Sequence, residues 1–197
     1  MYNMPTKLIG KQIIVRELRK SDAEDLQNNI NDKNIVRFMT NIPHPYSKRD
    51  ALNFFKKISR YRKTKKDAAF GIALKTTNKV IGGIGMHKID KGNNNVELGY
   101  WLGKKYWGRE IATEAVGLVL DLVFKKWKFH RVYANTFHKN IASQKVLKKF
   151  GFKLEGRTRE KWWRENQWHD VLNFGILDRE YKKGKYPPSP RLPPACR

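Results

Sequence analysis

Short runs of β-branched and aromatic residues alternate along this chain with stretches whose apolar positions recur at helical spacing. Runs that are bounded by turn residues and rich in Val, Ile, Tyr and Phe predict β-strands. The expected strands are residues 12–18, 68–75, 79–89, 96–102, 131–137, 152–163 and 167–177. The short connection at 76–79 predicts a hairpin between the second and third of these strands, and the last two would pair as a terminal hairpin.

Helical periods separate several of these strands. Ser21 with Glu24 resembles a capping box that opens a first helix, and Ser47 with Asp50 resembles the start of a second. A longer helix after residue 110 carries one apolar face, made by Ile111, Ala115, Leu118, Val119 and Leu122. A shorter helix follows residue 140 and ends at Gly151. Helices interspersed with strands, without an internal repeat or linker, predict a single α+β domain.

Composition supports a folded domain and adds a strong charge. Of 197 residues, 40% are hydrophobic and 12% aromatic, which is typical of a globular chain. Lys and Arg number 42 against 18 Asp and Glu, a net charge of +24. Such a surface attracts nucleic acid, phosphorylated cofactors and acidic proteins, although a generally lysine-rich surface explains it equally well. The domain is expected over residues 8–181, and residues 182–197, basic and proline-rich, are expected to form a disordered tail.

Cysteine use and hydropathy favour a cytoplasmic protein. Cys196 is the sole cysteine, so no internal disulfide can form. No signal peptide is recognisable, and the longest apolar patch is interrupted by Asp121 and too short to span a membrane. The five histidines lack metal-ligand spacing, so no metal is expected.

The start of the long helix is the first candidate for binding chemistry. The leading N–H groups of a helix have no partner within it, and the helix dipole favours an anion there. Trp107, Gly108 and Arg109 supply a turn before Glu110. An ordinary strand–turn–helix corner is the alternative.

Two polar positions form the next candidates. Asn140 and Ser143 open the shorter helix, although Asn140 is fully explained as a helix cap. Glu97 is a carboxylate inside an apolar strand, where alternation places it on one face with Gly99 and Trp101. A carboxylate among aromatic rings would have a raised pKa and could serve as a base; an exposed edge or a salt bridge to a lysine is the alternative.

Two further motifs carry weaker signals. The GGIG run at 82–85 completes neither a dinucleotide fingerprint nor a P-loop, so a bulged or closely packed strand is expected. The KWWRENQW run at 161–168 mixes cations with aromatic residues, as single-strand RNA binders do. A hairpin whose aromatic residues face a core or a substrate groove is the favoured interpretation.

In order and spacing, three segments resemble the GNAT acetyltransferases. They are VELGYWLGKKYWGREIATEA, NIASQKVLKKFGFKLEGRTRE and HDVLNFGIL. The nearest branch is the RimJ/RimL type, which acetylates N-terminal amines of ribosomal proteins. The resemblance implies a strongly twisted mixed β-sheet flanked by helices, with central strands that splay apart to admit acetyl-CoA.

The resemblance also implies a set of site residues. Main-chain groups of Tyr100, Trp101 and Leu102 would bond the pantetheine arm, and Asn140 and Ser143 would lie near the acyl end. The diphosphate would be held by Trp107, Gly108, Arg109, Glu110, Ile111, Ala112 and Thr113.

Glu110 departs from the family's loop pattern, which has glycine at this position. Because the phosphates are bound by main-chain N–H groups, glycine is required only where φ is positive or a Cβ would strike the ligand. We therefore expect a negative φ at Glu110, with its carboxylate turned outward into water.

The implied reaction is direct transfer of an acetyl group from acetyl-CoA to a primary amine. A protein N-terminal α-amine, with a reference pKa of about 7.7–8.0, loses its proton with little help. Glu97 is the first candidate base, with Glu155 and Glu160 as alternatives, and Ser143 would protonate the departing thiolate. Main-chain N–H groups would stabilise the oxyanion.

The acceptor is less constrained. The positive charge disfavours polyamines and favours an amine on an acidic or ribosomal protein, with rRNA contacts through residues 60–66 and the tail lysines. An antibiotic or other small amine is an alternative acceptor, and an RNA-binding relative with impaired CoA binding is an alternative function. The sequence leaves the choice between monomer and homodimer open.

Overall fold

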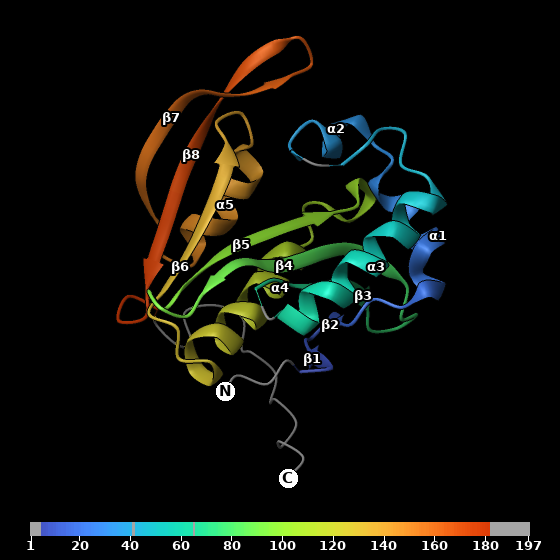
Figure 1. The fold of residues 1–197 in the computed structure, drawn as a ribbon, viewed down its shortest axis with the longest axis horizontal. Coiled ribbons are helices and arrows are strands. Elements are labelled where there is room, and N and C mark those ends of the chain that lie inside the picture. The colour runs from blue at the N-terminus through green and yellow to red at the C-terminus, as the bar shows by residue number, and fades with distance from the viewer. Residues whose placement is uncertain (1–4, 41, 65, 182–197) are drawn as a thin grey trace.

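The computed structural model describes residues 5–40, 42–64 and 66–181, which form one eight-stranded mixed sheet with helices on both faces (Figure 1). The strand order is β1-β2-β3-β4-β5-β6-β8-β7. The strands are β1 Lys7–Ile9, β2 Ile13–Arg16, β3 Ala68–Leu74, β4 Val80–Asp90, β5 Asn95–Leu102, β6 Arg131–Phe137, β7 Lys153–Arg164 and β8 Gln167–Leu177. The longer helices are α1 Ala23–Ile30, α3 Lys48–Thr64, α4 Ile111–Asp121 and α5 Ile141–Lys149; α2 Lys33–Val36 is a single turn, and the π-helical turn η3 Leu122–Lys126 extends α4.

The sheet parts in its middle. β5 and β6 are parallel neighbours, but they pair only through residues 95–97 and 131–133, from Asn95↔Arg131 to Glu97↔Tyr133. Beyond this point the two strands diverge (Figure 1), while β4 still pairs with β5 as far as Leu102 and β8 with β6 as far as Phe137. The predicted splayed sheet is therefore confirmed.

Two apolar layers hold the helices in place. On one face α4 buries the predicted stripe from Ile111 to Leu122 against Met86, Val96 and Leu98 of the sheet. On the other face α1 and α3 pack over β3 and β4 around Leu26, Ala51 and Trp101. The loop that leads into α4 therefore lies toward the first face, and the second face is left to α1 and α3.

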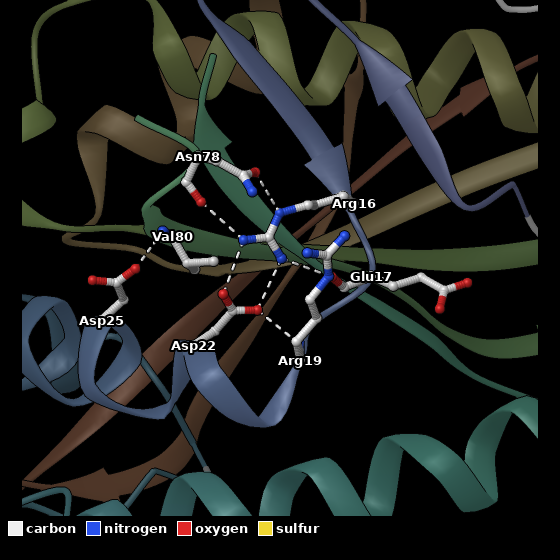
Figure 2. Close-up of polar contacts among 7 residues, drawn as sticks. All are labelled: Arg16, Glu17, Arg19, Asp22, Asp25, Asn78 and Val80. Atoms are coloured by element: carbon white, nitrogen blue, oxygen red, sulfur yellow. Dashed lines mark hydrogen bonds and ion pairs between the residues drawn. The ribbon is translucent and has the colours of Figure 1, made fainter. Parts of the chain in front are cut away.

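A buried ion pair fixes the start of α1 (Figure 2). The Arg16 guanidinium donates to both oxygens of Asp22 at 2.8 and 2.9 Å and to Asn78 in the β3–β4 turn. Burial alone would raise the pKa of Asp22, but hydrogen bonds from Arg16 and from the Arg19 N–H lower it. The stability gained from this pair is therefore present at neutral pH and is lost as the pH falls through the folded-state pKa.

This cluster corrects one sequence prediction. The helical turn begins at Lys20 with Arg19 as its N-cap, and Asp22 supplies the carboxylate that accepts from the Arg19 N–H at 2.7 Å, so the Ser21–Glu24 capping box is wrong. Asp22 serves because it also faces Arg16, a partner from a strand that local spacing does not reveal. The second predicted cap is confirmed, since Ser47 and Asp50 bond each other's N–H groups at 2.8 and 3.2 Å.

The other strands and longer helices follow the prediction closely, whereas β1 and α2, which were not predicted, are too short to give a periodic signal. The tail at 182–197 lies outside the described residues. Within the described part of the chain, no helix has the length and apolar character needed to cross a bilayer.

Candidate active site

Beyond Glu97, where its pairing with β6 ends, β5 has an unpaired main-chain edge. Asn94 accepts on the β6 side from Arg131, whereas the Gly103 N–H donates to Ile81 at the end next to β4. Because hydrogen-bonding direction alternates along a strand, the even-numbered residues of β5 face β6. Tyr100 and Leu102 therefore direct their main-chain groups into the opening, and the Leu102 carbonyl already accepts from the Trp107 indole at 2.7 Å.

Trp101 does not share this opening. A Cβ placed on Gly82 would lie 2.5 Å from the Trp101 carbonyl, so that group points to β4. Its indole lies against Gly83 in the layer of α1 and α3. Three residues were expected to bond the pantetheine arm through their main chain. Because the direction of the main-chain groups alternates, Tyr100 and Leu102 face the opening and Trp101 does not.

The turn before α4 presents a row of main-chain donors. Within the described residues, no hydrogen-bond partner exists for the N–H groups of residues 108–113, whereas the next N–H, of Glu114, bonds to Glu110. Gly108 takes a left-handed φ of 74° with nothing within 4 Å of a Cβ there. Together with the start of the helix, these groups form a row of donors, here called the cradle, whose geometry suits an anion.

The predicted negative φ at Glu110 is wrong. Glu110 is left-handed at φ 57°, which costs a non-glycine residue roughly 1–2 kcal/mol. The side chain is 60% exposed, as expected, but it is bound: Lys149 Nζ lies 2.5 Å from its carboxylate. Hydrogen bonds from Lys149 and then Thr113 lower the pKa of Glu110. The Lys149 ammonium thus offsets the negative charge of Glu110 beside these N–H groups.

Lys149 itself was not predicted as a site residue. It lies in the last turn of α5, where a cation is favoured by the helix dipole, and its link to Glu110 ties α5 to the start of α4. A carboxylate in a glycine-like position, with a lysine 39 residues later, is too weak a sequence signal to identify the pair.

A pair of hydroxyl groups bridges the opening from β5 to α5. Tyr100 Oη lies 3.0 Å from Ser143 Oγ, and Asn140 caps α5 by accepting from the Ser143 N–H at 3.2 Å. Burial raises the pKa of Tyr100 to about 12, so the phenol stays protonated at neutral pH. The geometry thus brings Tyr100, Asn140 and Ser143 together, through a Tyr100 side-chain contact that was not predicted.

Glu97 takes the second of its two predicted environments. Its carboxylate binds Lys88 Nζ at 2.8 Å and accepts from the Asn135 amide at 2.8 Å. The ion pair with Glu97 raises the pKa of Lys88. The salt bridge to a lysine is therefore present in place of an aromatic surrounding.

The other two carboxylates lie on β7. Glu155 is paired with the Arg131 guanidinium. Glu160 sits in an irregular stretch of β7 with a left-handed φ of 48°, and its N–H donates to Asp170 at 2.8 Å. The structure thus gives Glu155 a structural partner, and it brings neither residue into contact with Tyr100 or Ser143.

The aromatic hairpin lies against solvent rather than in a core. Trp162, Trp163 and Trp168 are 37%, 54% and 55% exposed, so they do not face a core, and the substrate groove remains as the other half of the expectation. Arg164 near the tip donates to the Thr40 carbonyl after α2, and the Phe38 and Phe137 rings lie 6.2 Å apart. These contacts flank the wide end of the opening between β5 and β6.

Comparisons with known proteins agree with this geometry. A profile of the acetyltransferase (GNAT) domain matches residues 12–153. The Bacillus subtilis protein YjcK, named a probable N-acetyltransferase, is 33% identical over 178 residues that cover 87% of this chain and 97% of YjcK. The Escherichia coli ribosomal protein uS5-alanine N-acetyltransferase is 23% identical over 129 residues, covering 65% of this chain and 66% of that protein.

Solved structures share the fold. The structure of Mycobacterium smegmatis RimJ in complex with CoA-disulfide superposes with a TM-score of 0.83 at 21% identity, covering 92% of this chain and 91% of that one. At this identity the likeness concerns the fold alone.

Proposed function

This chain belongs to the acetyltransferase (GNAT) domain family, and from that premise we propose that it transfers an acetyl group from acetyl-CoA to the N-terminal α-amine of a protein. Its place near the RimJ/RimL branch and its N-acetyltransferase activity are confirmed by the family match and by its relatives. The choice of acetyl-CoA and of the acceptor is our inference.

The observation that carries the proposal is the opening between β5 and β6, with donors at both of its ends. The unpartnered N–H groups of 108–113 suit a diphosphate, and the open edge at Tyr100 and Leu102 suits an amide-containing arm. The Tyr100 and Leu102 N–H groups would bond that arm, and the Tyr100 N–H would also support the oxyanion as the amine attacks.

Two hydroxyl groups supply a route for the proton that the leaving group needs. As the new C–N bond forms and the C–S bond breaks, Ser143 Oγ donates to the sulfur and recovers its proton from Tyr100 Oη or from water. Tyr100 can act in this way because burial keeps its phenol protonated. The attacking nitrogen must shed its own protons elsewhere.

The acceptor is proposed from relatives and from charge. The E. coli relative is named for an alanine of ribosomal protein uS5. The net charge of +24 repels polyamines and attracts amines carried by acidic chains or presented beside RNA. Arg60 and Lys66 are exposed and suit such a contact, whereas the tail lysines lie outside the described residues.

The test has two stages. Calorimetric titration with CoA should show one saturable site. Incubation of a proteome with enzyme and labelled acetyl-CoA, followed by mass spectrometry, should place label on protein α-amines. Label on lysine side chains or small amines would contradict the acceptor, and absence of any CoA binding would favour an RNA-binding relative instead.

A further inference from the structure

We propose that His87, positioned by Asp67, is the general base that deprotonates the acceptor amine. The inference rests on the acetyl transfer proposed above. It assigns the role to a side chain on the face of the sheet opposite α4, which sequence reasoning considered only as a metal ligand.

His87 and Asp67 form an oriented pair. The His87 Nδ1 lies 3.2 Å from Asp67 Oδ1, and the same oxygen accepts from the Lys88 N–H at 3.2 Å. A proton on Nδ1 therefore satisfies the carboxylate and leaves the lone pair on Nε2. Within the described residues Nε2 has no hydrogen-bond partner.

Two glycines make room for this imidazole. A Cβ on Gly85 would lie 2.8 Å from Nε2, and a Cβ on Gly99 would lie 3.4 Å from it. These residues face each other across β4 and β5, so the Nε2 edge of the ring lies over both glycines. The GGIG run, predicted to be closely packed, thus also provides the floor beneath a histidine.

The location is what makes this pair suitable. Gly99 directly precedes Tyr100, whose main chain faces the opening, and follows Glu97 by two residues, where the β5–β6 pairing ends. Met86 and Leu98 point from the same strands toward α4, so His87 is on the other face. A cofactor held at the start of α4 and an amine beside Nε2 would therefore meet at β5 from opposite faces.

Lys88, whose backbone conformation is strained, helps to position Asp67 and His87. Lys88 has a left-handed φ of 48°, and the β4–β5 register shifts between His87 and Asp90. This bulge turns the Lys88 N–H to Asp67 and its ammonium to Glu97. Bulges commonly re-aim side chains beside active sites.

Glu97 is less suited to the same role. It is the cross-strand neighbour of His87, but its oxygens are occupied by Lys88 and Asn135. The charged groups that neighbour the imidazole are thus Asp67, Lys88 and Glu97, with Tyr133 opposite Glu97 on β6. His87 is 42% exposed at its side chain and accessible to an incoming amine.

The proton balance is simple. Nε2 takes one proton from the acceptor ammonium and releases it to water, which leaves a neutral amine. That amine forms the C–N bond as the C–S bond breaks. The second proton shed by nitrogen balances the one that the thiolate gains by way of Ser143.

The experiment compares His87→Gln, Asp67→Asn, Glu97→Gln and His130→Gln, assayed with acetyl-CoA and a synthetic peptide that has a free N-terminal alanine. His130 is a matched control because its Nδ1 also lies 3.2 Å from a carboxylate, that of Asp178, on the surface. We expect His87→Gln to lower kcat by about 100-fold at neutral pH. The KM for acetyl-CoA should stay unchanged, and the remaining fall of kcat/KM on the acid side should follow only the protonation of the acceptor amine.

Asp67→Asn should show a smaller loss of kcat and a displaced acid limb, because it acts through the imidazole, and Asp67→Glu should recover part of the activity. Added imidazole should partly restore His87→Gln. CoA titration of each variant confirms that it has folded.

The inference is overturned if His87→Gln binds CoA normally and keeps the wild-type kcat and pH profile, or if Glu97→Gln alone produces the loss of kcat and the change in pH profile expected of His87→Gln. A wild-type enzyme that fails to turn over acetyl-CoA would instead refute the proposed function.

Discussion

The Arg16 cluster and the opening between β5 and β6 are both polar places in an apolar protein, but they treat their polar groups in opposite ways. Around Arg16, donors meet acceptors on β2, α1 and the β3–β4 turn. Along the turn before α4, six successive N–H groups, from residue 108 to residue 113, have no partner in the described part of the chain. The first region holds two elements together, and the second is preorganised for the acceptor atoms of a ligand.

The largest expected effect comes from removing Arg16, whose hydrogen bonds join β2 to the start of α1. Arg16→Met should lower the free energy of unfolding by about 3–5 kcal/mol, because it leaves the Asp22 carboxylate buried without its partner. Urea unfolding, followed by circular dichroism, measures this change. The double variant Arg16→Met with Asp22→Leu should recover most of the loss; an equal loss in the double variant would mean that the pair itself stabilises the fold.

The next effect concerns Ser143, beside the opening between β5 and β6, where a substitution should leave the free energy of unfolding nearly unchanged. Ser143→Ala should lower kcat by about 10- to 100-fold and raise the KM for acetyl-CoA much less, because it removes a proton donor and no main-chain contact. Steady-state kinetics at saturating acceptor provide the measurement. An unchanged kcat would remove Ser143 from the chemistry.

The smallest expected effect is a change in the affinity for CoA when Glu110 is replaced. Glu110→Gly should lower the Kd for CoA by about 2- to 5-fold, because it removes a carboxylate from the cradle, while relief of the left-handed strain should raise stability in the free and bound protein alike. Titration calorimetry measures the affinity, and Lys149→Met is the matched variant that should weaken binding. Tighter binding after Lys149→Met would show that the ion pair competes with the ligand.

Much of the fold could be predicted from local patterns. The strand at 131–137 was placed with its observed bounds, and Asn140, Ser143 and Gly151 lie where a short capped helix requires them. Alternation along 96–102 put Glu97 and Trp101 on one face and Tyr100 on the other, as the structure has them. These features depend on neighbours within a few positions, which a sequence displays directly.

What could not be predicted depends on partners far along the chain. Arg19 and Asp22 form the helix start in place of Ser21 and Glu24, with Arg16 bound to Asp22. Glu110 is held in its left-handed conformation with Lys149 bound to its carboxylate. Asp67 and His87 are joined by the register of β3 and β4 and by a bulge at Lys88. A single sequence carries no direct signal for such pairs, so polar residues in unusual conformations are where its predictions fail.

The narrow junction between β5 and β6 also sets the mechanics of the molecule. Three residue pairs join the five strands on one side of the sheet to the three on the other, so bending concentrates at this seam. A small rotation there would change the gap between Tyr100 and Ser143 more than any distance inside either half. Small rotations about this junction would let the width of the opening adjust to a bound ligand without disturbing the packing of either half.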